Sequence, residues 1–218
     1  IIAVADLFGA SLWFSANGVA DALIQLWGVG PAGIGNLTSA VQAGFIVGTL
    51  AFALTGFADR HPASRIFAAF AGFGAAANAG MAWLAEGLGA AVVWRFATGF
   101  ALAGIYPIGM KLVVSWTPQH TGHALGWLVG MLTLGTAFPH LVRAIGWNLD
   151  WRAVIVTSSL LALLAGAMVW RLGDGPHLAR RNAGAISLGA VLHAFRIPDF
   201  RASALGYFGH MWELYAFW

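Results

Sequence analysis

The sequence predicts an all-α, polytopic transmembrane helix bundle, and three observations lead to this fold class. Of the 218 residues, 60% are hydrophobic and only 9% are charged, which excludes soluble, disordered and nucleic-acid-binding proteins. Apolar runs as long as a membrane-crossing helix follow one another along most of the chain. These runs lack the alternation of a lipid-facing strand, so the backbone must close its hydrogen bonds within helices.

Six complete spans and the start of a seventh are predicted. A helix of about 20 residues crosses the hydrocarbon layer, and the six apolar runs of this length cover residues 1–23, 34–57, 66–85, 89–115, 122–145 and 152–172. The seventh run opens near Ala202, and the sequence ends inside it. Since the chain also begins without Met, we expect it to be part of a longer protein whose C-terminal half follows.

The connections between the spans are short, with one exception. Residues 28–31 and 86–87 join antiparallel neighbours. Residues 173–201 are longer and basic, and we interpret them as a cytoplasmic linker between the six-helix bundle of residues 1–172 and the seventh helix of residues 202–218. Apolar linker residues at helical spacing predict either an amphipathic helix on the membrane surface or a solvated segment: Leu188, Val191, Leu192 and Phe195.

The basic residues predict the orientation, since Lys and Arg in short loops stay on the cytoplasmic side. The chain has 11 Lys and Arg against 8 Asp and Glu, a net charge of +3. Most of the basic residues fall on one side of the predicted bundle: Arg60, Arg65, Lys111, Arg171, Arg180, Arg181, Arg196 and Arg201. Arg143 and Arg152 fall on the other side, and Arg95 lies inside a span. We therefore expect an integral protein of the bacterial inner membrane whose chain begins in the cytoplasm.

Two motifs in a fixed order carry a family resemblance. The loop after the second span reads GFADRHPASR (residues 56–65), and the fourth span contains Arg95 followed by spaced glycines. Together they resemble the signature loop and the fourth-helix motif of the major facilitator superfamily. The loop departs from the family pattern at Thr55 and Pro62, where the family has Gly.

The resemblance implies a twelve-helix secondary transporter, of which this chain is the N-terminal half and the start of the seventh helix. Such a protein moves a small solute, here a small organic or inorganic anion, by alternating access with a proton as the expected coupling ion. The six spans would form two inverted repeats of three helices, with the substrate near the midplane. The expected partners are substrate, lipid bilayer, coupling ion and the missing C-terminal half.

Enzyme readings find little support in the sequence. His120 and His123 lack a third metal ligand at a credible spacing, Ser158 lacks the Gly-rich turn of a nucleophile, and the chain has no Cys. We expect no enzyme, metal or cofactor, and no nucleic-acid partner. The alternative to a transporter is a six-helix membrane protein with a sensory, scaffolding or hydrolytic role.

Polar side chains within spans are candidate functional residues, because each costs about 2.5 to 3.5 kcal/mol at the bilayer centre. Asp6, Trp13 and Asn17 are spaced to share one face of the first span, and Arg95 and Tyr106 share a face of the fourth. The expected substrate-binding residues are Trp13, Asn17, Arg95 and Tyr106. Arg95 would hold an anionic group bidentately. Alternatively, Arg95 bonds backbone carbonyls and holds the bundle together, and Asn17 packs helices.

The expected proton-coupling residues are Glu213, His210 and Asp6. Glu213 and His210 are three residues apart in the seventh run, and Glu213 lies about ten residues from its start, near the midplane. Such groups take up and release protons as access alternates. Alternatively, a helix outside this chain satisfies the pair, and Asp6 reaches water at the cytoplasmic end.

The signature loop supplies the expected gating residues Asp59, Arg60 and Arg65. In the family that the loop resembles, the Asp pairs across the two halves of the transporter on the cytoplasmic face, and the pair breaks on each turnover. The alternative is a solvated turn that caps the third span.

Overall fold

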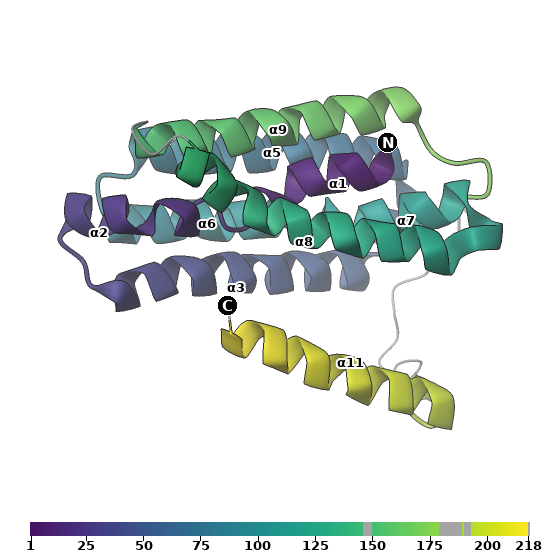
Figure 1. Cartoon of the computed structure of the whole chain (residues 1–218). Helices are drawn as coiled ribbons and strands as arrows, with labels where there is room; N and C mark the ends of the chain where they lie inside the picture. The colour runs from purple at the N-terminus through teal and green to yellow at the C-terminus, as the bar shows by residue number, and fades with distance from the viewer. Residues whose placement is uncertain (146–149, 179–188, 190–192, 218) are drawn as a thin grey trace.

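The computed structural model describes residues 1–145, 150–178, 189 and 193–217, and within these ranges every regular element is a helix (Figure 1). Five described segments are long and apolar enough to cross a membrane: Pro31–Thr55, Ala63–Leu84, Leu88–Trp116, Pro118–Ile145 and Trp151–Leu172. They match the second to sixth predicted spans and confirm the all-helical membrane class. Some linker residues named above lie outside the described residues: Arg180, Arg181, Leu188, Val191 and Leu192.

The first predicted span is not one continuous helix. Helix α1 (Ile2–Ala10) ends in an irregular turn over residues 11–16, and η1 (Asn17–Val19) and α2 (Ala20–Trp27) follow. In the turn, the N–H groups of Leu12 and Trp13 bond to carbonyls three residues back, at 3.3 and 2.9 Å. The expectation of an unbroken helix over residues 1–23 is therefore wrong, so that Asp6, Trp13 and Asn17 do not follow a single helical face.

The fourth predicted span is divided as well. Helices α6 (Leu88–Leu102) and α7 (Tyr106–Trp116) are separated by a turn over residues 103–105. Pro107 has no N–H, so the carbonyl of Ala103 loses its helical donor. The N–H groups of Gly104 and Ile105 bond instead to carbonyls three residues back, at 2.9 and 3.0 Å.

Local sequence sets the ends of the remaining helices. Helix α3 (Pro31–Thr55) begins with Pro and is followed by Gly56 in the left-handed conformation, at φ 63°. The short α4 (Phe57–Arg60) leads into α5 (Ala63–Leu84). After η2 (Pro118–His120) come α8 (Thr121–Ile145) and α9 (Trp151–Leu172), and α11 (Pro198–Phe217) begins four residues before Ala202.

Close helix packing in the bundle depends on glycine. Helix α3 packs along α6, α5 packs against α6 and α9, and α1 packs against α8 and α9. A Cβ at Gly44 would meet the carbonyl oxygen of Phe96, and one at Gly99 would meet that of Val41. The backbones of α3 and α6 therefore approach one another closely, as small residues allow in membrane helices.

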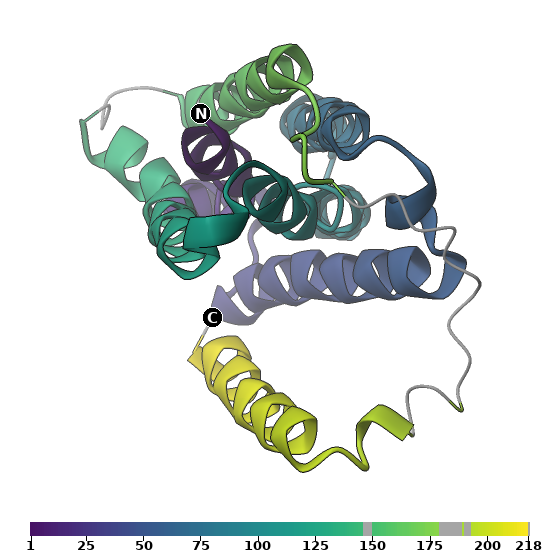
Figure 2. The same ribbon diagram turned by 90° about the vertical axis from the view of Figure 1, so that its right-hand side faces the viewer.

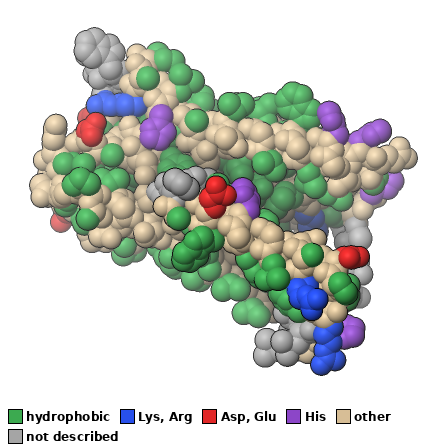
Figure 3. All heavy atoms as spheres, turned by 60° about the horizontal axis from the view of Figure 1, so that its bottom comes forward, with side chains coloured by type: hydrophobic (Ala, Val, Ile, Leu, Met, Phe, Trp, Pro, Cys, Tyr) green, Lys and Arg blue, Asp and Glu red, His purple; other side chains and the backbone are tan. Residues whose placement is uncertain are grey.

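Helices α1, α5 and α9 run along one common direction, whereas α3 lies across it, and α11 lies on the side of α3 (Figures 1 and 2). The N-terminus, the loop after α4 and the ends of α7 and α9 lie at the same end, which we call the N-terminal end of the bundle (Figure 1). On the face that includes α11, hydrophobic side chains are spread over the surface and charged side chains are few (Figure 3). This surface suits a lipid environment.

Candidate functional site

A cavity of about 500 Å³ lies between α11 and the bundle. Its walls come from the turn after α1 and from α3, α7, α8 and α11: Trp13, Phe45, Tyr106, Val129, Leu132, Thr133, Thr136, Tyr207, His210, Met211, Leu214 and Tyr215. Three residues predicted from the sequence, Trp13, Tyr106 and His210, are thus brought together. This volume is in the usual range for small-molecule sites.

The cavity wall is aromatic with a few polar groups. The rings of Trp13 and Phe45 lie 4.9 Å apart at an angle of 54°. The hydroxyls of Thr133 and Thr136 donate to carbonyls of their own helix, at 3.1 and 2.8 Å, so their oxygens are left as acceptors toward the cavity. Such a wall stacks on a flat apolar solute and offers hydrogen bonds to its polar ends.

Both helix breaks lie beside this cavity. Trp13 belongs to the turn after α1, and Tyr106 is the first residue after the turn between α6 and α7. The last turn of α1 also packs against the break in the fourth span, since a Cβ at Gly9 would stand 2.7 Å from Cγ2 of Ile105. Interrupted helices at corresponding positions of two repeats are a feature of substrate sites in transporters.

Arg95 lies behind the cavity wall. Its side chain is 0% exposed, and it donates hydrogen bonds to the carbonyl oxygens of Leu12, at 3.0 Å, and of Trp13. Asn17 is also directed away, since its Nδ2 donates to Thr38 Oγ1 at 2.8 Å. Neither side chain lines the cavity, and the geometry favours the alternative in which both hold helices together.

Two residues of the Arg95 network were not singled out from the sequence. Asn78 Oδ1 accepts from Ser15 Oγ at 2.6 Å and from Arg95 at 3.4 Å. Both Asn78 and Ser15 are fully buried. An Asn in the otherwise apolar run of α5 was the available signal, because a lone amide in a span requires partners.

The three predicted proton-coupling residues have different surroundings. Asp6 is fully buried beside Gly109, and neither carboxylate oxygen has a hydrogen bond among the described residues. His210 lines the cavity. Glu213, less than one turn further along α11, is exposed and does not line it.

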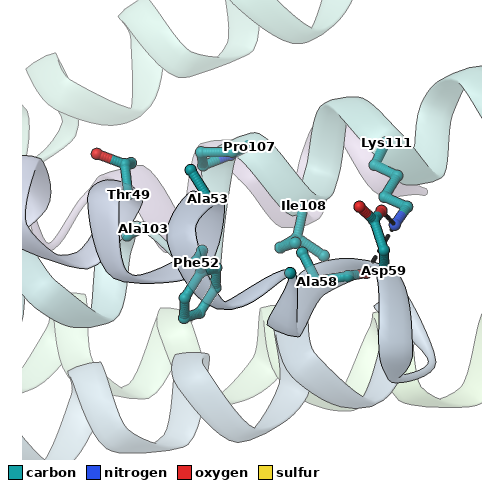
Figure 4. A pocket seen from close by; sticks show the side chains of 10 residues that line it. Thr49, Phe52, Ala53, Ala58, Asp59, Ala103, Pro107, Ile108 and Lys111 are labelled. Carbon is teal, nitrogen blue, oxygen red and sulfur yellow. Dashed lines mark hydrogen bonds and ion pairs between the residues drawn. The ribbon is translucent and has the colours of Figure 1, made fainter. Parts of the chain in front are cut away.

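The signature loop forms a second pocket, of about 220 Å³, at the N-terminal end of the bundle. Lys111 donates to Asp59 Oδ1 and to the carbonyl of Ala58, both at 2.6 Å. The Lys111 and Asp59 side chains point toward one another at one end of this pocket (Figure 4). Arg60 and Arg65 are exposed. Lys111 was counted from the sequence only as a topological charge, because its 52-residue separation from Asp59 conceals the contact.

A sequence profile of the Major Facilitator Superfamily matches residues 2–218. The chain belongs to this superfamily. The resemblance carried by the two motifs is thereby confirmed, as are a membrane-integral location and the prediction that the chain is not an enzyme. Superfamily membership does not favour the sensory, scaffolding or hydrolytic alternative. No group of three or more His, Asp and Glu suited to a metal ion occurs among the described residues.

Two known proteins are similar to this superfamily member. The 4-hydroxybenzoate transporter PcaK of Pseudomonas putida is 28% identical over an alignment of 178 residues, and the match covers 76% of this chain and 37% of PcaK. The solved MFS proton:xylose symporter XylE, bound to 6-bromo-6-deoxy-D-glucose, has a TM-score of 0.66 at 17% identity, over 80% of this chain and 45% of XylE. The second likeness concerns the fold alone. The chain spans less than half the length of either protein.

Proposed function

We propose that the protein is a secondary active transporter that moves a small organic anion by alternating access, coupled to protons. The observation that carries this proposal is the cavity beside two interrupted spans in a member of the superfamily. In the full assembly, α1 and α2 together form the first of six spans, the spans form two inverted repeats of three, and a C-terminal half closes the cavity. The relatives' greater length supports the last point.

The substrate class that the cavity favours is a single-ring aromatic carboxylate. Trp13, Phe45 and Tyr106 offer faces and edges for a flat ring. His210 and the threonine oxygens offer polar contacts for a hydroxyl or a carboxylate. The similarity to PcaK, a 4-hydroxybenzoate transporter, supports the same class. Arg95 and Asn17 support the site from behind its wall.

Asp6 is the proton site that the geometry favours within this proposal. Its carboxylate is buried without a hydrogen-bond partner in the part of the chain that the structure describes, and protonation removes the free-energy cost of such a buried charge. His210 would exchange protons at the cavity itself, and Glu213 would do so once a second half covers α11. Asp59 would act as the gate, with Arg60 and Arg65 free to meet the other half. The N-terminal end of the bundle, where these charges gather, would face the cytoplasm of a bacterium.

The test is uptake of labelled 4-hydroxybenzoate by the purified protein in proteoliposomes. An inward proton gradient should drive accumulation of the label above its external concentration. Accumulation should be absent in protein-free liposomes and should be abolished by a protonophore. Replacing Asp6 by Asn should remove the gradient dependence while passive exchange persists. Uptake of no aromatic carboxylate would refute the substrate class, and gradient-independent uptake would refute the coupling.

A further inference from the structure

The turn that divides the first span is held by one side chain of the fourth. Arg95 donates to the carbonyl oxygens of Leu12 and Trp13, and its Nη1 lies 3.2 Å from the hydroxyl of Ser15. Charged donors form stronger hydrogen bonds than neutral ones. These bonds therefore favour the irregular turn over a continuous helix, in which backbone N–H groups would take the same carbonyls.

Arg95 is itself fixed from two further helices. Asn78 on α5 accepts from Arg95 and from Ser15 through the same oxygen. The Asn78 amide nitrogen then donates to the carbonyl of Ile155 and to the hydroxyl of Ser159 on α9, at 3.0 and 3.1 Å. The turn is thus connected to α5, α6 and α9, and its backbone cannot shift without breaking the network.

The network ends at a residue of the cavity wall. Trp13 lines the cavity beside Phe45 while only 4% of its surface is exposed, so its ring position follows the backbone that carries it. Arg95 does not line the cavity. A fully buried guanidinium whose Nη1 and Nη2 already donate to protein acceptors is poorly placed to bind a solute carboxylate.

We propose that Arg95 is a positioning residue for substrate binding: it holds the backbone of residues 12–15 in the irregular turn and thereby presents the Trp13 ring to the solute. It acts without touching the solute. The proposal rests on the proposed transport function for its substrate readout, and on the described hydrogen bonds for its structural readout.

The substrate readout compares an acid with its uncharged analogue. Uptake of 4-hydroxybenzoate and its inhibition by 4-hydroxybenzamide are measured for the unchanged protein and for Arg95→Gln and Arg95→Lys. We expect Arg95→Gln to raise the KM of the acid and the inhibition constant of the amide alike, by roughly tenfold or more, with their ratio kept within about twofold. Lys retains the charge but not the fork that bridges two carbonyls, so Arg95→Lys should recover only part of the loss.

A double variant separates action through Trp13 from direct contact. Trp13→Ala combined with Arg95→Gln should have the same KM as Trp13→Ala alone, because the ring that Arg95 positions is gone. A ratio of acid to amide affinity that collapses in Arg95→Gln would overturn the proposal, since it would show that the guanidinium contacts the carboxylate.

The structural readout is hydrogen exchange of the backbone amides in residues 11–18, which needs no substrate. Arg95→Gln should change the exchange rates of the amides in this segment. If Arg95→Gln does not fold, the milder Ser15→Ala replaces it in the test and should change the same rates to a smaller extent. The matched control is Arg152→Gln, because Arg152 also donates to a backbone carbonyl, that of Ala82, at 3.1 Å. Unchanged exchange in the Arg95 and Ser15 variants would overturn the inference even if transport is confirmed, whereas a change confined to this segment supports it even if no aromatic carboxylate is transported.

Discussion

The Asp6 carboxylate lies directly against Gly109. A methyl group at position 109 would stand 3.0 Å from Asp6 Oδ1, closer than nearly all real contacts of a Cβ. Since α1 and α7 pack against one another at this point, neither helix can move away freely. The missing side chain of Gly109 is therefore what leaves room beside the buried carboxylate.

Gly109→Ala should impair proton-coupled uptake. The added methyl crowds the carboxylate, and proton-driven uptake should fall about tenfold or more, because overpacking costs about 1–3 kcal/mol. Uptake driven by a proton gradient and exchange at equal pH are compared. The control is Gly126→Ala, whose added Cβ meets nothing within 4 Å. Equal activity of the two variants would argue against a role of Asp6 in coupling.

Lys111→Ala should loosen the pocket at the N-terminal end of the bundle. The ion pair with Asp59 is partly exposed, at 25% and 43% for the two side chains, so it contributes about 1 kcal/mol or less. Because the chain has no Cys, maleimide labelling of Ala58→Cys, at a half-buried position in the wall of the same pocket, reports this change. Labelling should rise by up to about fivefold. Arg171→Ala, at an exposed position, is the control.

Charge exchange gives a sharper version of this test. Asp59→Lys with Lys111→Asp should restore low labelling if the pair itself closes the pocket. Labelling that stays high in the exchanged protein would mean that the loop, and not the pair, controls access.

Asn78→Ala should destabilise the bundle by about 1–3 kcal/mol, because it leaves donors of Ser15 and Arg95 without their shared acceptor. Thermal unfolding in detergent should therefore occur several degrees lower. Asn36→Ala, at an exposed position of α3, should leave the midpoint unchanged. A similar midpoint for both variants would show that the buried network adds no stability.

Tyr106 should contribute its ring more than its hydroxyl. Tyr106→Phe keeps the aromatic surface in the cavity, whereas Tyr106→Ala removes it, at a cost of about 1.5 kcal/mol or more in binding, roughly tenfold in KM. Uptake kinetics for both variants measure this order. A larger effect from Phe than from Ala would contradict stacking of the substrate on the ring.

The sequence was sufficient to predict the helical spans and the superfamily. Runs of apolar residues locate helices because the bilayer requires about 20 of them, and the second to sixth predictions lie within a few residues of the observed ends. The divisions of the first and fourth spans were not predicted. The first depends on Arg95, which is 82 residues from Trp13, and such a distant contact leaves no mark on local hydropathy.

The sequence predicted a cavity residue only where that residue stands out as polar or aromatic within its own span. Trp13, Tyr106 and His210 line the cavity as polar or aromatic residues in spans tend to do. Tyr207 and Tyr215 were missed, because a single sequence does not show which face of α11 turns toward the bundle. Arg95 was singled out correctly as unusual, but its burial and its acceptors could only be read from the packed helices.

Proton-coupled entry of an aromatic carboxylate is tested most directly by recording the internal pH of proteoliposomes during uptake. Adding 4-hydroxybenzoate to proteoliposomes that contain the protein should acidify the interior while the label enters, and Asp6→Asn should abolish the acidification. Entry of the label without acidification, or no entry at all, with the unchanged protein in its folded state would contradict proton-coupled transport.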